Sequence, residues 1–81
     1  MSTLDRIAII TGAGTGIGKQ TTLAFLKAGY SVVLAGRREE PLKQAVEEAQ
    51  ADESKTLIVP TDVSDQTSVQ NLFAETIKKF N

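Results

Sequence analysis

Short apolar runs alternate with amphipathic stretches three times along this chain. The apolar runs at residues 7–11, 31–35 and 56–59 are almost continuously apolar and contain many β-branched side chains, which is typical of strands that are covered on both faces. A parallel sheet needs a crossover connection between successive strands, and that connection is usually a helix. The alternation therefore predicts an α/β fold with a parallel sheet, in the order βαβαβα.

The amphipathic stretches set the expected helix bounds. The first helix is expected over residues 17–28, because Gly29 follows where a left-handed C-terminal cap is common. The second is expected to start near Pro41, a residue suited to a first helical turn. The third is expected to follow Ser64 as its N-cap and to carry apolar side chains at helical spacing as far as Phe80.

The size and composition of the chain exclude several classes of protein. Its 81 residues form one small domain at most. A net charge of −1 argues against the broad basic surface that nucleic-acid binding requires. With no Cys and no His, the chain lacks the usual zinc ligands, and no metal site is expected. The apolar run at residues 7–10 is too short for a signal peptide or a membrane span, which favours a cytoplasmic protein with no membrane partner.

Four glycines stand close together between the first expected strand and the first expected helix. They lie in the sequence TGAGTGIG at residues 11–18. A strand-to-helix turn directs backbone N–H groups and the helix dipole at one spot, which favours an anion. Glycines permit turn conformations closed to other residues and let a pyrophosphate approach the backbone, and Thr15 can add a hydroxyl donor. The turn is therefore the first candidate binding site.

The spacing of these glycines excludes two other phosphate-binding loops. A P-loop requires Gly at position 13 and Ser or Thr after Lys19, where this chain has Ala13 and Gln20. The common dinucleotide spacing G-x-G-x-x-G also fails, because Ile17 or Lys19 stands where its third glycine belongs. The pattern that remains is T-G-x-x-x-G-I-G.

This pattern, placed after an N-terminal strand, resembles the cofactor loop of the short-chain dehydrogenase/reductase family. The resemblance implies a three-layer Rossmann-type parallel sheet, of which these residues form one βαβαβα half of a doubly wound domain. It also implies an oxidoreductase that transfers hydride between a nicotinamide cofactor and a small carbonyl or alcohol substrate, commonly as a homo-oligomer. The cofactor-binding residues of the turn are then Gly12, Thr15, Gly16, Ile17 and Gly18.

The residues at the end of the second expected strand indicate which cofactor, NAD(H) or NADP(H), the site prefers. An NAD site normally has an acid there to hold the ribose hydroxyls, whereas this chain has Gly36 followed by Arg37 and Arg38. Guanidinium groups suit a ribose 2′-phosphate, and the arrangement is similar to that of NADP-preferring members of the family. We therefore expect NADP(H) in preference to NAD(H). The alternative is that both arginines only neutralise Glu39 and Glu40.

Asp62 and Val63 follow the third expected strand, at the edge of the sheet where ligands of open α/β folds bind. The pair resembles the family's adenine-contacting element, in which the carboxylate accepts from the exocyclic amine and the backbone of the second residue reads the ring edge. The alternative is that Asp62 or Ser64 caps the next helix.

The residues with which the family moves a proton, a Tyr-x-x-x-Lys pair, have no match in this chain. Tyr30 is followed four residues later by Leu34. We therefore expect residues 1–81 to be the N-terminal half of a dinucleotide-binding domain, inactive alone, with the catalytic half after Asn81 and the first strand left as an apolar edge.

Two other hypotheses stay open from the sequence. One is a non-catalytic nucleotide-binding or assembly module that ends naturally at residue 81 and uses the open first strand for pairing. The other is a simple phosphate or mononucleotide binder, which would not distinguish a dinucleotide from adenosine 2′,5′-bisphosphate.

Overall fold

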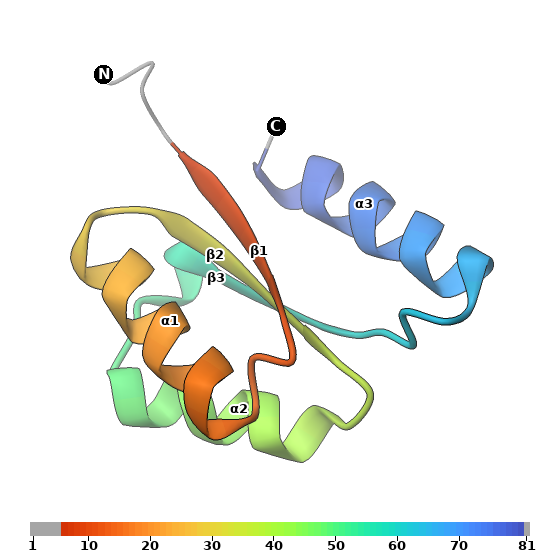
Figure 1. Ribbon diagram of the computed structural model, residues 1–81. Coiled ribbons are helices and arrows are strands. Elements are labelled where there is room, and N and C mark those ends of the chain that lie inside the picture. The colour runs from red at the N-terminus through yellow and green to blue at the C-terminus, as the bar shows by residue number, and fades with distance from the viewer. Residues whose placement is uncertain (1–5, 81) are drawn as a thin grey trace.

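Three strands form one parallel sheet in the computed structural model, which describes residues 6–80. Each strand hydrogen-bonds to the next in chain order, so β2 lies between β1 and β3 (Figure 1). The register places Ile7 beside Ser31, and Val32 beside Thr56. The strands are β1 Ile7–Thr11, β2 Ser31–Gly36 and β3 Thr56–Pro60.

Helices cover both faces of this sheet. Figure 1 shows α1 and α2 on one face and α3 on the other. The predicted βαβαβα order and the three-layer parallel sheet are therefore confirmed. The helices are α1 Gly16–Lys27, α2 Glu39–Ala49 and α3 Gln66–Phe80, and a short 3-10 turn, η1 Glu53–Lys55, precedes β3.

The central strand β2 supplies the core on both faces because its side chains alternate. Val32 and Leu34 are fully buried in the cluster beneath α1 and α2. Val33 and Ala35 are fully buried in a second cluster, beneath α3, where they meet Leu72. This double burial explains why the strand is apolar without interruption.

Helix α2 begins at Glu39, earlier than the expected start near Pro41. Pro41 is its third residue, where the missing N–H is one of those that a helix start leaves without an internal acceptor. Glu39 and Glu40 also place two carboxylates in the first turn, where the helix dipole favours them. Helix α1 ends as expected before Gly29, whose φ is +92°.

The prediction that Ser64 caps α3 is wrong. Asp65 immediately precedes the helix, and its carboxylate accepts from the backbone N–H of Thr67, in the first turn, at 3.0 Å. Ser64 instead donates its N–H and its hydroxyl to one oxygen of Asp62, at 2.9 and 2.6 Å. Asp62 and Ser64 therefore form the turn that leads into α3, and neither caps it.

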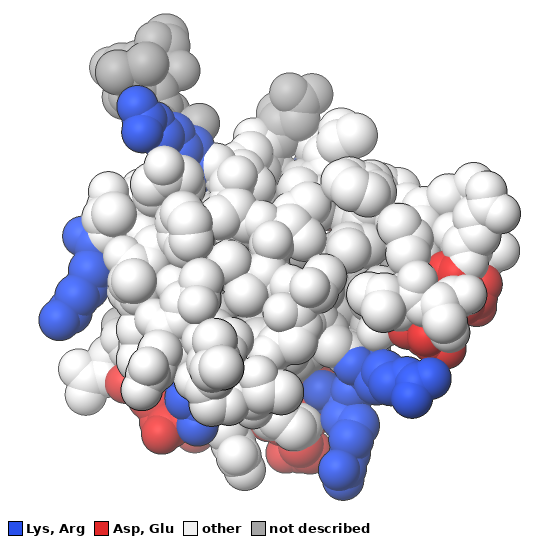
Figure 2. Space-filling model, viewed as in Figure 1, with Lys and Arg blue, Asp and Glu red and all other residues white. Residues whose placement is uncertain are grey.

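The outer edge of β1 is apolar and partly exposed, as predicted. Ile7 is exposed, and on α3 the side chains of Phe73 and Ile77 are 53% and 59% exposed. Figure 2 shows a broad area without Lys, Arg, Asp or Glu at the centre of this view, with charged side chains around it.

Within residues 6–80, no helix combines the length and the apolar character needed to cross a bilayer.

Leu34→Ala is expected to lower the free energy of unfolding by about 2–5 kcal/mol, because it opens a cavity at the centre of the sheet. Chemical denaturation followed by circular dichroism measures the loss. Phe73→Ala is the matched control: its side chain is half exposed, so we expect a change within about 1 kcal/mol. Equal losses in the two variants would contradict this description of the core.

Candidate functional site

The carboxyl ends of the three strands open onto a groove formed by two adjoining cavities. One, of about 430 Å³, lies over the ends of β2 and β3 and the loop after β3. The other, of about 320 Å³, lies between the glycine turn and the start of α2. The cavities share Gly12, Gly36 and Arg37. Open α/β sheets bind ligands at this edge.

The groove brings together six of the nine side chains or backbone positions predicted from the sequence. Gly12, Thr15, Arg37, Arg38, Asp62 and Val63 line one or both cavities. The other three lie at the start of α1: Gly16 and Ile17 are exposed in its first turn, and Gly18 is buried beneath it.

Gly18 is required by the close approach of α1 to the glycine turn. A Cβ atom at this position would stand 2.0 Å from the carbonyl oxygen of Gly12 and 3.0 Å from the Cα of Ala13. Gly12 itself has a φ of +64°, which disfavours residues with a side chain. The packing and the backbone of the protein itself therefore require a glycine at positions 12 and 18.

Nothing within the described part of the protein requires a glycine at position 16. Its φ is not positive, and a Cβ atom added to it would meet nothing within 4 Å. Within residues 6–80, no protein acceptor pairs with the N–H groups of Gly16 and Ile17, which belong to the helix start that has no internal acceptors. An open space beside unpaired N–H groups at a helix N-terminus fits a pyrophosphate.

Thr15 holds the turn rather than offering its proton to a ligand. Its hydroxyl donates to the carbonyl oxygen of Gly12 at 2.8 Å and accepts from the N–H of Gly18 at 3.3 Å. It is therefore the N-cap of α1. The hydroxyl hydrogen that the sequence suggested for an anion is used inside the turn.

Arg37 is paired with Asp62 across the first cavity and not with the acids that follow it. Its Nη2 atom lies 3.5 Å from an oxygen of Asp62, and its side chain is 74% exposed. Glu39 instead pairs with Lys43, at 2.9 Å. Arg38 is the extended residue before α2 and is also exposed. In the described part of the chain, neither arginine forms an ion pair with Glu39 or Glu40.

The carboxylate of Asp62 is held in its charged form. The two hydrogen bonds from Ser64 are the main cause that lowers the pKa of Asp62 from its ordinary value, and the nearby Arg37 adds to them. The N–H of Asp62 donates to the Ser68 hydroxyl at 2.9 Å, which fixes the backbone of this loop to α3. The carboxylate therefore faces the groove as an acceptor at neutral pH.

Pro41 and Leu42 line the second cavity, and no sequence motif predicts them as site residues. A Cβ atom on Gly14 would stand 2.5 Å from the Cβ of Pro41. This contact between distant segments follows from the packing of α2 against the sheet, and no local sequence motif predicts it. The sequence offers one hint of this contact. Gly14 is a glycine of the turn that the motif T-G-x-x-x-G-I-G does not require, so another part of the protein must require it.

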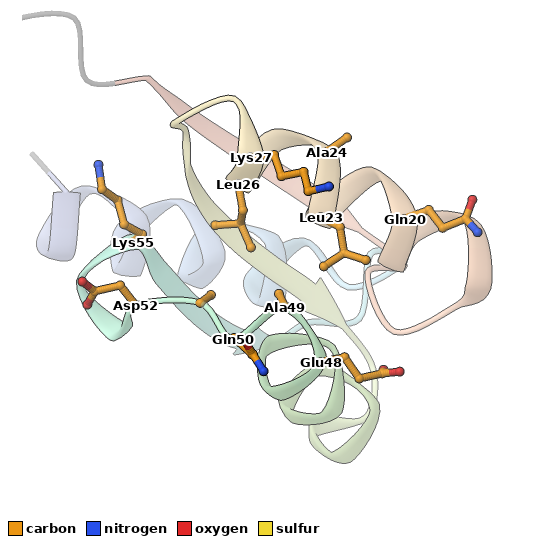
Figure 3. Close-up of a pocket in the computed structure, with 11 residues that line it drawn as sticks. Gln20, Leu23, Ala24, Leu26, Lys27, Glu48, Ala49, Gln50, Asp52 and Lys55 are labelled. Carbon is orange, nitrogen blue, oxygen red and sulfur yellow. The ribbon is translucent and has the colours of Figure 1, made fainter.

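A larger cavity, of about 680 Å³, lies between α1 and α2, and it contains none of the predicted residues. Figure 3 shows its walls, with Leu23 and Leu26 from α1 and Ala49 from α2. The C-terminal ends of both helices border it, and their dipoles present partial negative charge there. Its two lining lysines, Lys27 and Lys55, are matched by two lining acids, Glu48 and Asp52, so the cavity has no excess of cationic side chains to hold a phosphate.

The fold is a parallel α/β sheet with a groove at the carboxyl ends of its strands, and comparison with known proteins gives its family. The family model described as "short chain dehydrogenase" matches residues 6–81. An uncharacterized oxidoreductase of Staphylococcus haemolyticus is 45% identical over 75 residues, which cover 93% of this chain and 32% of that protein. The chain therefore belongs to the short-chain dehydrogenase family.

Solved structures of other proteins superpose closely on this chain. A short-chain dehydrogenase/reductase from Burkholderia phymatum, solved in complex with NAD, has a TM-score of 0.85 and 33% identity; the match covers 99% of this chain and 29% of that one. The N-domain of a bacterial malonyl-CoA reductase, solved with NADP, has a TM-score of 0.84 and 33% identity, covering 93% of this chain and 14% of that one. These relatives were thus solved with either dinucleotide.

This chain spans about a third of the length of the curated relatives that it matches. The range that the family model matches holds the sheet, the glycine turn and the three helices described above.

Gly18→Ala and Gly16→Ala are expected to separate structural from binding roles in the turn. Gly18→Ala forces a Cβ atom against the Gly12 carbonyl and should lower the free energy of unfolding by about 1–3 kcal/mol. Gly16→Ala meets open space and should keep or slightly raise stability, while weakening binding of a pyrophosphate-containing nucleotide. Thermal melts and calorimetric titration measure the two effects. A Gly16→Ala variant that binds as well as the wild type would contradict the role of the open space.

Proposed function

We propose that this chain supplies the NADP(H)-binding part of a short-chain oxidoreductase. The observation that carries the proposal is the placement of two sets of groups at the carboxyl edge of the sheet. Unpaired N–H groups stand at the start of α1, directly after Thr15, which lines the second cavity. Two arginines that line the same cavity stand at the end of β2, where an NAD site has an acid. Both sets of groups favour phosphate.

Each part of the groove has a distinct task in this proposal. The N–H groups of Gly16 and Ile17 bind the pyrophosphate, which reaches the backbone because Gly16 has no side chain. The exposed side chain of Ile17, at 83%, provides an apolar surface at the same helix start. Asp62 accepts from the adenine amine, and Val63 borders the ring from the first cavity.

Arg37 and Arg38 are the proposed ligands of the 2′-phosphate. The ion pair of Arg37 with Asp62 is long, at 3.5 Å, and lies at the surface, so it contributes little and releases the guanidinium readily. A doubly charged phosphate is a stronger partner than one exposed carboxylate. Because relatives were solved with NAD and with NADP, the proposed preference depends on these two residues.

The proposed reaction of the whole enzyme is hydride transfer between a carbonyl or alcohol carbon and the nicotinamide, which supplies the redox chemistry when it is bound. The relative from Staphylococcus haemolyticus is named an oxidoreductase, which supports this class of reaction. This chain has no Tyr-x-x-x-Lys pair, so its own residues bind and orient the dinucleotide. We propose that the 81 residues alone do not catalyse the reaction.

Arg37→Asp is expected to reverse the cofactor preference. The new carboxylate repels a 2′-phosphate and accepts from the ribose hydroxyls, so the ratio of the NADH to the NADPH dissociation constant should fall by about tenfold or more. Isothermal titration of the purified protein with each dinucleotide measures the ratio.

Lys78→Asp is the matched control, because it makes the same reversal of charge in the last turn of α3, away from the groove. We expect its ratio to stay at the wild-type value. An unchanged ratio in Arg37→Asp, or an equal fall in both variants, would contradict the assignment of the 2′-phosphate to Arg37.

A further inference from the structure

The glycine turn and the start of α2 lie in close contact at Gly14 and Pro41. A Cβ atom on Gly14 would lie 2.5 Å from the Cβ of Pro41, 3.3 Å from its carbonyl carbon and 3.5 Å from its Cα. The φ of Gly14 is not positive, so no backbone conformation demands a glycine at this place. The demand comes from Pro41, which is half buried against the turn.

The same turn of α2 packs against the end of β2. A Cβ atom on Gly36 would lie 3.2 Å from a methyl carbon of Leu42, and Leu42 is almost fully buried in the core. Leu42 therefore fixes the depth of α2 against the sheet, while Pro41 fixes its distance from the glycine turn. Arg37 and Arg38 lie in the short segment between Gly36 and Pro41, and both line the second cavity.

We propose that Pro41 is a positioning residue that sets the width of the ribose-phosphate cavity, and so the discrimination between dinucleotides with and without a 2′-phosphate. This inference depends on the NADP(H) site proposed above. The glycine turn holds the pyrophosphate end of the ligand, and the start of α2 carries the arginines. A ligand with a 2′-phosphate spans both, whereas a ligand without it has no partner on the arginine side.

The contact has room for one β-carbon between two backbones. The wild type places it on residue 41, Gly14→Ala places one on each side, and Pro41→Gly leaves none. The double variant Gly14→Ala/Pro41→Gly moves the single β-carbon to the other side, where the nearest backbone atoms of residue 41 are 3.3 and 3.5 Å away. If Pro41 acts as a spacer, the double variant should therefore recover the discrimination between the two dinucleotides that either single variant loses.

The test compares the dissociation constants of the purified protein for NADH and NADPH, by titration, in the wild type and the three variants. We expect the ratio of the NADH to the NADPH constant to fall about fivefold in Gly14→Ala and in Pro41→Gly, which is part of the effect of one charge-assisted hydrogen bond. In the double variant, the ratio should rise most of the way back to the wild-type value. If Gly14→Ala does not fold, the fall in Pro41→Gly still tests the contact.

Gln44→Gly is the matched control for the cost of a glycine in α2. Gln44 is an exposed residue of the same helix and lines neither cavity of the groove, so it should lower the melting temperature and leave the ratio unchanged. Unchanged ratios in the single variants, or a double variant that discriminates less than both, would overturn the role of Pro41. A wild-type ratio near one would instead contradict the proposed NADP(H) preference itself.

Discussion

The contact between Gly18 and the carbonyl of Gly12 is the constraint on which the site depends. It brings the first turn of α1 directly over the end of β1, where a side chain on residue 18 would collide with backbone. Thr15 then closes the turn by bonding both glycines. Because the helix starts so close to the strand, its unpaired N–H groups lie at the carboxyl edge of the sheet, directly after Thr15, which lines the groove.

The sequence predicted the parts of this structure that local chemistry determines. The strands were recognisable because Val32, Val33 and Leu34 are buried on alternate faces of a covered sheet, which leaves no polar position in the run. The glycine turn was recognisable because its spacing excludes the other phosphate loops. Arg37 was recognisable because it follows the strand end at which an NAD site has an acid, and the structure places it over the groove.

The sequence did not predict the features that depend on distant contacts. The pairing of Arg37 with Asp62 joins loops from two strands, and the contact of Gly14 with Pro41 joins two helix starts. Neither has a local pattern. The cap of α3 was misassigned because Ser64 and Asp65 are both good N-caps, and only the hydrogen bonds to Asp62 show which one is used elsewhere.

An NMR titration with NADP⁺, which follows the backbone amide of every residue, tests the central claim most directly. The account predicts that the largest shifts fall on the amides of Gly16, Ile17 and Arg37, because these groups border the proposed phosphates. The amides of Gln50 and Asp52, in the cavity between α1 and α2, should move little. Shifts confined to that cavity, or no shifts at Gly16 and Ile17, would contradict the assignment of the groove.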